Sequence, residues 1–284
     1  MDFSSKKVYQ KVKDHSVSGE TFELLLDEEL QLLKTAPEPS PENLGSYYES
    51  DDYISHTDGK RSFFEKIYHF VKQKALKDKI KVLESFLPRK GRLLDIGAGT
   101  GDFLVTAKNN GWEIAGIEPS EKARNIAVNK GIEFISGLSE VPDNAFNAVT
   151  MWHVLEHVPD IEQHIKELKR ILAPGGVIIV AVPNYNSYDA KYYGEFWAAY
   201  DVPRHLWHFS KTAIAKLFAR QDFKVVKILP MIFDSFYVSL LSEKYKNGKM
   251  NFIKGFWIGL TSNLKAGKNF EYSSHIYVIK EAKN

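Results

Sequence analysis

Short apolar runs alternate with helix-forming segments from residue 92 to residue 280 of this 284-residue chain. The run VIIVAV has no polar interruption, which is typical of a strand covered on both faces. Seven segments fit strands: residues 92–96, 112–118, 132–136, 146–152, 177–182, 223–229 and 275–280. Strands that alternate with helices predict an α/β fold with a mostly parallel, doubly wound sheet. Such sheets bind ligands beyond the carboxyl ends of their strands, so we expect the functional residues there.

The composition excludes several classes of function. The chain has 44% hydrophobic and 26% charged residues, as ordinary globular proteins do, and its net charge of +2 gives no global attraction to nucleic acid. The absence of cysteine excludes disulfides, thiolate zinc sites and a cysteine nucleophile. The N-terminus lacks the apolar core of a secretory signal, and no run reaches the roughly 18 apolar residues of a membrane span. We therefore expect a cytoplasmic protein without a transmembrane segment; no pattern indicates its oligomeric state.

The chain divides into two parts. Residues 1–50 form a candidate N-terminal extension that ends in the proline-rich sequence TAPEPSPEN. Residues 51–284 form the main domain, which opens with a predicted helix over 60–87. Two aromatic-rich segments within it, 184–210 and 230–271, are much longer than the usual loop of about 4 to 6 residues. We expect them to form a helical and aromatic cap over the carboxyl end of the sheet.

A glycine-rich turn follows the first strand, and an acidic residue ends the second. Asp95 lies at the end of the first strand. Gly97, Gly99 and Gly101 follow it, where glycine allows a tight turn and the close approach of a ligand. Glu118 is placed to accept hydrogen bonds from the hydroxyl groups of an adenosine ribose. The order of strand, loop, helix and acid favours a nucleotide-like cofactor; simple strand-to-helix packing is the alternative.

Four ordered motifs carry a resemblance to a known family: LLDIGAGTG, GIEPS, MWHVLEHVPD and LKRILAPGGVIIVAVPN. The loop spacing G-x-G-x-G differs from the dinucleotide-binding pattern G-x-G-x-x-G. Over residues 90–229 the chain resembles the class I S-adenosylmethionine-dependent methyltransferases, in particular the small-molecule group that includes the ubiquinone-biosynthesis O-methyltransferases. The resemblance implies a Rossmann-like sheet of seven strands, with HIYVIK as an antiparallel last strand.

The resemblance also implies a site for S-adenosylmethionine at the ends of the first strands. The loop would hold the methionine part and Glu118 the ribose. Pro119 and Ser120, together with Gly137 and Leu138 after the third predicted strand, would contact the adenine. In chain order the implied residues are Asp95, Gly97, Gly99, Gly101, Glu118, Pro119, Ser120, Gly137 and Leu138. Trp152 and His153 would line the floor between cofactor and acceptor; core packing is the alternative for Trp152.

The segment after the fifth strand contains candidates for the acceptor side. Nine of the 25 residues from Tyr185 to Phe209 are aromatic, which predicts an aromatic-walled pocket. His205 and His208 are candidate general bases, because histidine ionises near neutral pH. The other candidates are Asp201 to orient an imidazole, Arg204 to bind an anionic group, and Tyr185, Tyr192 and Trp197 to line the pocket. The alternative is a packed cap in which Asp201 and Arg204 pair with each other.

The motif HVLEHV raises the question of a metal site. Some relatives in the resembled group hold a divalent ion with Glu-x-x-Glu-His and a further histidine downstream. This chain has His153 in place of the first glutamate, which disfavours hard cations. We therefore predict no metal and a structural role for Glu156 and His157, with metal binding by these two residues as the alternative. His153 is also a candidate catalytic residue.

Two features concern partners and the N-terminal extension. From Ser242 to Asn284 there are eight lysines and three glutamates, which fits an anionic acceptor or weak contact with a membrane surface; a solvated lysine face is the alternative. Relatives in the resembled group often carry a Cys-x-x-Cys knuckle before a stretch similar to TAPEPSPENLGSYYES. By that register Asp27 and Leu30 occupy the cysteine positions, which predicts a metal-free remnant of the knuckle.

The sequence thus favours an S-adenosylmethionine-dependent methyltransferase that acts on an oxygen of a small metabolite or a sugar-containing precursor. One alternative is a metal-assisted RNA 2′-O-methyltransferase, which needs a basic groove and a Glu and His ligand set. The balanced charge counts against nucleic acid as a partner, and His153 counts against the ligand set. Another is a noncatalytic scaffold that keeps the cofactor pocket, because fold alone does not imply activity.

Overall fold

The computed structural model describes residues 1–48, 63–87 and 89–282 of the chain. These residues contain two β-sheets and three hydrophobic clusters. The predicted domain boundary at residue 50 and the start of the helix expected from residue 60 lie outside the described residues.

The larger sheet has six strands in the order β5-β4-β6-β7-β10-β9. They are β4 (Arg92–Ile96), β5 (Glu113–Ile117), β6 (Phe146–Trp152), β7 (Leu172–Pro183), β9 (Phe223–Pro230) and β10 (Ser274–Glu281). The first four pair in parallel, and β10 pairs antiparallel with both β7 and β9. The α/β class, the mostly parallel sheet and the antiparallel last strand are therefore confirmed.

One predicted strand, residues 132–136, does not form. Phe134 makes a single parallel bridge with Gly116, whose N–H donates to the Glu133 carbonyl and whose carbonyl accepts from the Ile135 N–H. The Phe134 ring also lies against Gly116, where a β-carbon would come within 2.9 Å of it. Beyond β5 the sheet is extended only by this one bridge among the described residues. Such very short edge strands are common, because they limit pairing with other chains. The sheet has six strands rather than the seven predicted.

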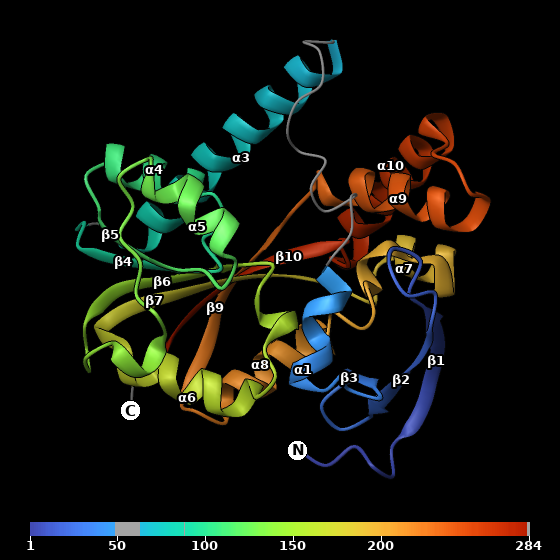
Figure 1. Cartoon of the computed structure of the whole chain (residues 1–284), viewed down its shortest axis with the longest axis horizontal. Helices are drawn as coiled ribbons and strands as arrows, with labels where there is room; N and C mark the ends of the chain where they lie inside the picture. The colour runs from blue at the N-terminus through green and yellow to red at the C-terminus, as the bar shows by residue number, and fades with distance from the viewer. Residues whose placement is uncertain (49–62, 88, 283–284) are drawn as a thin grey trace.

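Helices cover both faces of this sheet (Figure 1). On one face lie α3 (Phe63–Phe86), α4 (Asp102–Asn109) and α5 (Glu121–Val128), and on the other lie α6 (Ile161–Ile171) and α8 (Lys211–Ala219). The side chains of Ser120, Asp160 and Ser210 accept hydrogen bonds from first-turn N–H groups of α5, α6 and α8. These caps satisfy donors that a helix start leaves unpaired.

A second, antiparallel sheet is built mainly from N-terminal residues. It contains β1 (Lys7–Lys13), β2 (Thr21–Asp27), β3 (Leu32–Ala36) and β8 (Trp207–His208); α1 (Pro41–Leu44) and η1 (Gly45–Tyr48) follow β3 in the chain. In the turn between β2 and β3, the Asp27 carboxylate accepts a hydrogen bond from the Leu30 N–H at 2.9 Å, and Leu30 is buried. A hydrogen bond and apolar packing therefore close the turn that the knuckle register assigns to cysteines.

The segment 184–210 packs on this second sheet. It contains α7 (Tyr188–Tyr193), η4 (Gly194–Phe196) and η5 (Ala198–Tyr200). Tyr185 and Trp197 share a hydrophobic cluster with Phe22 and Leu24 of the N-terminal strands. The aromatic-rich composition of the segment therefore reflects a second core.

The segment between β9 and β10 forms a helical hairpin of α9 (Asp234–Asn247) and α10 (Phe252–Asn269), drawn in orange in Figure 1. The segment 230–271 is thus largely helical, and its role as a cap stays a prediction. Among the described residues, no helix combines the length and the apolar character needed to cross a bilayer.

Candidate active site

The loop between β4 and α4 leaves open space at Gly99. Gly97, Gly99 and Gly101 have φ values of 70°, 54° and 78°, which residues with a side chain rarely adopt. A β-carbon on Gly97 would collide with Val154, and one on Gly101 would come within 2.9 Å of Ala127. At Gly99 a β-carbon would meet no atom within 4 Å. Close packing therefore requires glycine at Gly97 and Gly101, and Gly99 borders open space with room for a ligand.

The Glu118 carboxylate lies beside this opening, just after β5. Its Oε2 accepts a hydrogen bond from the Gly99 N–H and its Oε1 from the Ser120 N–H, both at 2.8 Å. Glu118 is half-buried, and the neighbouring Pro119 and Ser120 are exposed. Because a carboxylate has about four lone-pair sites, both oxygens retain capacity for further donors. The arrangement fits two adjacent hydroxyl groups of a ribose.

Asp95 is buried at the end of β4, next to the loop. Thr150 Oγ1 donates to Asp95 Oδ1 at 2.6 Å. Burial raises the pKa of Asp95 to about 7, although Thr150 and Lys79 act in the opposite direction. The carboxyl group is therefore poised between its protonated and ionised forms at neutral pH.

Lys79 of α3 brings a positive charge to the same edge of the sheet. Its Nζ lies 4.1 Å from the centre of the Trp152 ring, within cation–π range. Burial lowers the pKa of Lys79, while Asp95 and Asp234 raise it. Sequence reasoning does not identify this residue, although it lies on the helix face that also carries the buried Leu76.

Three other residues assigned to the cofactor lie at η2 and at the end of β6. Gly137 precedes η2 (Leu138–Glu140), and the Leu138 carbonyl accepts a hydrogen bond from Arg170. Trp152 ends β6 and packs edge-on against Phe103, with ring centres 5.4 Å apart. Its buried Nε1 has no hydrogen-bond partner among the described residues. Trp152 thus combines core packing with a place beside Lys79.

His153 lies between two carboxylates. Its Nδ1 is 3.3 Å from Glu156 Oε1 and its Nε2 is 3.2 Å from Asp234 Oδ2. Burial disfavours the charged ring, but Asp234 and Glu156 outweigh it and raise the pKa of His153 to about 10. A protonated ring would donate to both carboxylates, and the catalytic role expected of His153 stays a prediction. Asp234 was not identified from the sequence; its signal is an acid inside an apolar segment.

Glu156, His157 and His205 converge, and one ligand atom of each lies within 4.8 Å of the others. His157 Nδ1 is 2.9 Å from the Arg204 carbonyl and His205 Nδ1 is 2.9 Å from the Ala199 carbonyl. Because carbonyls only accept, these contacts assign the proton to Nδ1 and a lone pair to Nε2 in each neutral ring. Glu156 is fully buried, and its Oε2 has no hydrogen-bond partner among the described residues. Glu156 and His157 lie on η3 (Leu155–His157). The cluster can therefore accept a proton or hold a cation.

The other predicted base, His208, belongs to the second sheet. It is buried in β8, with its Nε2 2.9 Å from Thr35 Oγ1. Burial lowers the pKa of His208 well below its usual value and holds that of His205 at about 4. Asp201 Oδ2 lies 3.9 Å from His205 Nε2. Of the two predicted bases, His205 lies next to Glu156, whereas His208 contacts Thr35.

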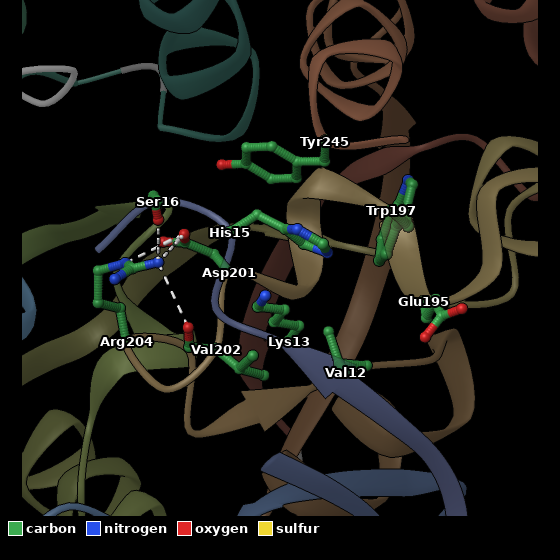
Figure 2. A pocket seen from close by; sticks show the side chains of 10 residues that line it. All are labelled: Val12, Lys13, His15, Ser16, Glu195, Trp197, Asp201, Val202, Arg204 and Tyr245. Atoms are coloured by element: carbon green, nitrogen blue, oxygen red, sulfur yellow. Dashed lines mark hydrogen bonds and ion pairs between the residues drawn. The ribbon is translucent and has the colours of Figure 1, made fainter. Parts of the chain in front are cut away.

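The Arg204 guanidinium binds protein oxygens (Figure 2). Its Nη2 lies 3.0 Å from Asp14 Oδ1 and 2.7 Å from Asp201 Oδ1, and its Nη1 donates to the Tyr47 carbonyl. A cavity of about 10 Å³ beside it, lined in part by His15, has room for about one water molecule. The Asp201–Arg204 pair weighed as an alternative is present, and the binding of an anionic group by Arg204 stays a prediction.

The predicted pocket residues do not share one wall. Tyr185 is buried and donates to the Gln31 carbonyl at 2.9 Å, and the buried Trp197 donates from Nε1 to Asp189 at 2.8 Å. Tyr192 is exposed, with Lys246 of α9 above its ring. Tyr185 and Trp197 therefore belong to the second core, because the N-terminal strands cover them.

Comparison with known proteins agrees with this geometry. Residues 68–228, more than half of the chain, match the model of a methyltransferase domain. A demethylmenaquinone methyltransferase of Bacillus licheniformis is 34% identical over 137 residues, which cover 41% of this chain and 59% of the relative. A ubiquinone biosynthesis O-methyltransferase of Alkalilimnicola ehrlichii is 30% identical over 105 residues, or 34% of this chain and 42% of the relative. The chain spans about half the length of the curated relatives it matches.

A solved structure shares the fold. The geranyl diphosphate C-methyltransferase of Streptomyces coelicolor, in complex with Mg²⁺, geranyl diphosphate and S-adenosyl-L-homocysteine, aligns with a TM-score of 0.55 at 15% identity. The alignment covers 79% of this chain and 88% of that one. The strand order, the glycine loop with its acid and the match over residues 68–228 show that the chain belongs to the family of S-adenosylmethionine-dependent methyltransferases.

Proposed function

We propose that this protein binds S-adenosylmethionine and transfers its methyl group to an oxygen of a small molecule. The observation that carries the proposal is the pairing of Gly99 with Glu118, which combines an open loop with a hydrogen-bonding carboxylate at the ends of β4 and β5. Relatives named for menaquinone and ubiquinone methylation support a small-molecule acceptor. The acceptor class is a small metabolite or a sugar-containing precursor.

The bound cofactor would supply an electrophilic methyl carbon on a sulfonium. Glu118 holds the ribose hydroxyls in this proposal, and the backbone at Gly99 leaves room for the methionine part. Lys79, beside Trp152, adds a positive charge that favours an anionic group on the cofactor or the acceptor. The main task of the protein is alignment, because an in-line displacement needs the acceptor atom about 3 Å from the methyl carbon.

An oxygen acceptor must also lose its proton, and His205 is the residue we assign to this step. Its Nδ1 is fixed on the Ala199 carbonyl, which leaves Nε2 as the proton acceptor. Asp201 lies near Nε2 and would stabilise the ring once it is protonated. Proton removal by His205 distinguishes this proposal from a noncatalytic scaffold that only binds the cofactor.

Replacing Glu118 by alanine should weaken S-adenosylmethionine binding by more than about tenfold. The substitution removes the two proposed hydrogen bonds from the ribose hydroxyls to the Glu118 carboxylate. A hydrogen bond to a charged group contributes about 1.5–3 kcal/mol. Calorimetric titration measures the change. Glu121→Ala is the matched control, because Glu121 is an exposed acid in the first turn of α5 and should leave the affinity unchanged. Equal affinity of Glu118→Ala and the native protein would refute the role of Glu118.

The Glu156–His157–His205 cluster favours a second candidate, metal-assisted methyl transfer. Two imidazoles and a carboxylate suit Zn²⁺ or Mn²⁺, and the backbone bonds to both Nδ1 atoms are those that orient histidine ligands. A metal bound there would lower the pKa of an acceptor hydroxyl, which makes a separate base unnecessary.

Metal titration separates the two candidates. The metal-assisted candidate predicts binding of one Zn²⁺ or Mn²⁺ per chain, weakened more than about tenfold in Glu156→Gln. The exposed Glu140→Gln is the control. No binding heat, together with full turnover after exhaustive chelation, would exclude the metal-assisted candidate and leave His205 as the base.

A further inference from the structure

The α9–α10 hairpin carries large apolar side chains on its outside. On α10, the side chains of Ile253, Trp257 and Leu264 are 75%, 59% and 67% exposed, and Phe256 is exposed beside them. These four residues, which we call the outer face, follow the spacing i, i+3, i+4 and i+11 and so share one side of the helix. A contiguous exposed apolar stripe of this kind marks an interaction surface.

The buried side of α10 is built from small residues instead. They are Gly255, Gly259, Ser262 and Ala266. A β-carbon on Gly259 would come within 2.9 Å of the Phe236 Cα, so the backbones of α9 and α10 are in close contact. The hairpin therefore holds together through small residues, and its large apolar side chains stay on the surface.

Lysines border the outer face. Residues 244–270 contain six lysines and no acidic residue. Lys254 and Lys265 lie on the flank of α10, and Lys249 is exposed in the connection next to the exposed Met250. Lys254 also contacts the buried Glu243 at 3.3 Å. A positive border around an apolar face complements an anionic lipid surface, whereas two copies of it facing each other would repel.

We propose that the outer face of α10 docks on the surface of an anionic lipid bilayer. With 18 residues and no capacity to span a membrane, α10 would lie in the plane of the headgroups. The same hairpin begins at Asp234, which contacts His153 beyond the end of β6. The docked hairpin would therefore also contact the end of β6 through Asp234. The proposal does not depend on the proposed methyl transfer.

Vesicle sedimentation tests the proposal. We expect the protein to bind vesicles of phosphatidylcholine mixed with phosphatidylglycerol, less tightly as salt rises, and to bind phosphatidylcholine alone at least about tenfold more weakly. The combined substitution Ile253→Ser and Trp257→Ser should weaken binding to the mixed vesicles by more than about tenfold, because two large apolar side chains no longer enter the bilayer. Both positions are exposed, so the variant should fold normally, which circular dichroism checks.

Trp257 gives a second readout. Trp112, Trp197 and Trp207 are buried, so a blue shift of tryptophan emission on adding mixed vesicles reports the entry of Trp257 into the bilayer. The shift should be lost in Trp257→Phe, which keeps an apolar side chain and so keeps most of the binding. A wild-type protein that sediments with vesicles without any shift would place the contact elsewhere and overturn the proposal.

Val128→Ser is the matched control. Val128 is 56% exposed at the end of α5, outside the hairpin, and its substitution should leave vesicle binding unchanged. Failure of the native protein to sediment with mixed vesicles overturns the proposal, as does equal binding by the double variant and Val128→Ser. Light scattering that shows a native dimer, converted to monomer by the double substitution and without vesicle binding, would instead identify a second copy as the occupant.

Discussion

Replacing His205 by alanine should lower the turnover of methyl transfer by about 10²–10⁴-fold, which is the usual contribution of a positioned general base. The affinity for S-adenosylmethionine should not change, because His205 lies in the cluster with Glu156 and His157 rather than beside Gly99 and Glu118. The measurement is the release of S-adenosylhomocysteine with a hydroxylated small-molecule acceptor found by screening. Cofactor affinity is measured on the same preparations.

His164→Ala is the matched control for this experiment. Burial lowers the pKa of His164 to about 4, as it does for His205, but His164 is on α6 with its Nε2 against the Met151 sulfur. It should retain turnover. His208→Ala should also leave the chemical step intact, since His208 contacts Thr35 in the second sheet. Full turnover in His205→Ala would show that neither proton removal nor metal binding at this ring is needed.

Replacing Arg204 by alanine should lower the free energy of unfolding by about 3–5 kcal/mol. Arg204 and Asp14 are both almost completely buried, with Nη2 and Oδ1 3.0 Å apart. Removal of one member of a buried ion pair leaves an uncompensated charge, which costs more than the pair itself contributes. The substitution also removes a link between the segment 184–210 and the N-terminal strands. Arg204 contacts both Asp201 of that segment and Asp14, which follows β1.

Arg220→Ala is the control for this prediction. Arg220 pairs with Glu162 at 2.6 Å, but both side chains are about two-fifths exposed, so its loss should cost about 0–1 kcal/mol. Urea denaturation followed by circular dichroism measures both variants. A loss of less than about 1 kcal/mol in Arg204→Ala would show that the buried pair does not hold the two parts together.

The pH dependence of stability follows from the same pair. Although burial acts to raise it, Arg204 and the N–H groups of Ser16 and Ser18 hold the pKa of Asp14 well below its usual value. The folded state therefore binds fewer protons than the unfolded state in the acid range. The stabilisation is present at neutral pH and is lost as the pH falls below about 4.

The arrangement of the glycine loop and Glu118 could be predicted because its geometry is local. Asp95 and Glu118 end neighbouring strands of one βαβ unit, so strand order alone brings their ends to one edge of the sheet. The positive φ values of the loop glycines follow from the same turn. The sheet edge was harder to predict, because residues 132–136 look like a strand but pair only at Gly116.

The contacts at the end of β6 and in the second core could not be predicted in the same way, because they join distant segments. Lys79 from α3 and Asp234 from α9 reach the end of β6 only through tertiary packing. Tyr185 and Trp197 have the composition of a pocket wall, but the strands that bury them lie more than 140 residues earlier in the chain. Composition does not distinguish a ligand-facing aromatic from one that another sheet covers.

Calorimetric titration of the purified protein with S-adenosylmethionine, and separately with S-adenosylhomocysteine, tests the central claim most directly. The geometry of Gly99 and Glu118 predicts binding of one molecule per chain with micromolar affinity for either compound. No detectable binding by the folded protein, in the presence or absence of an acceptor, would contradict the claim.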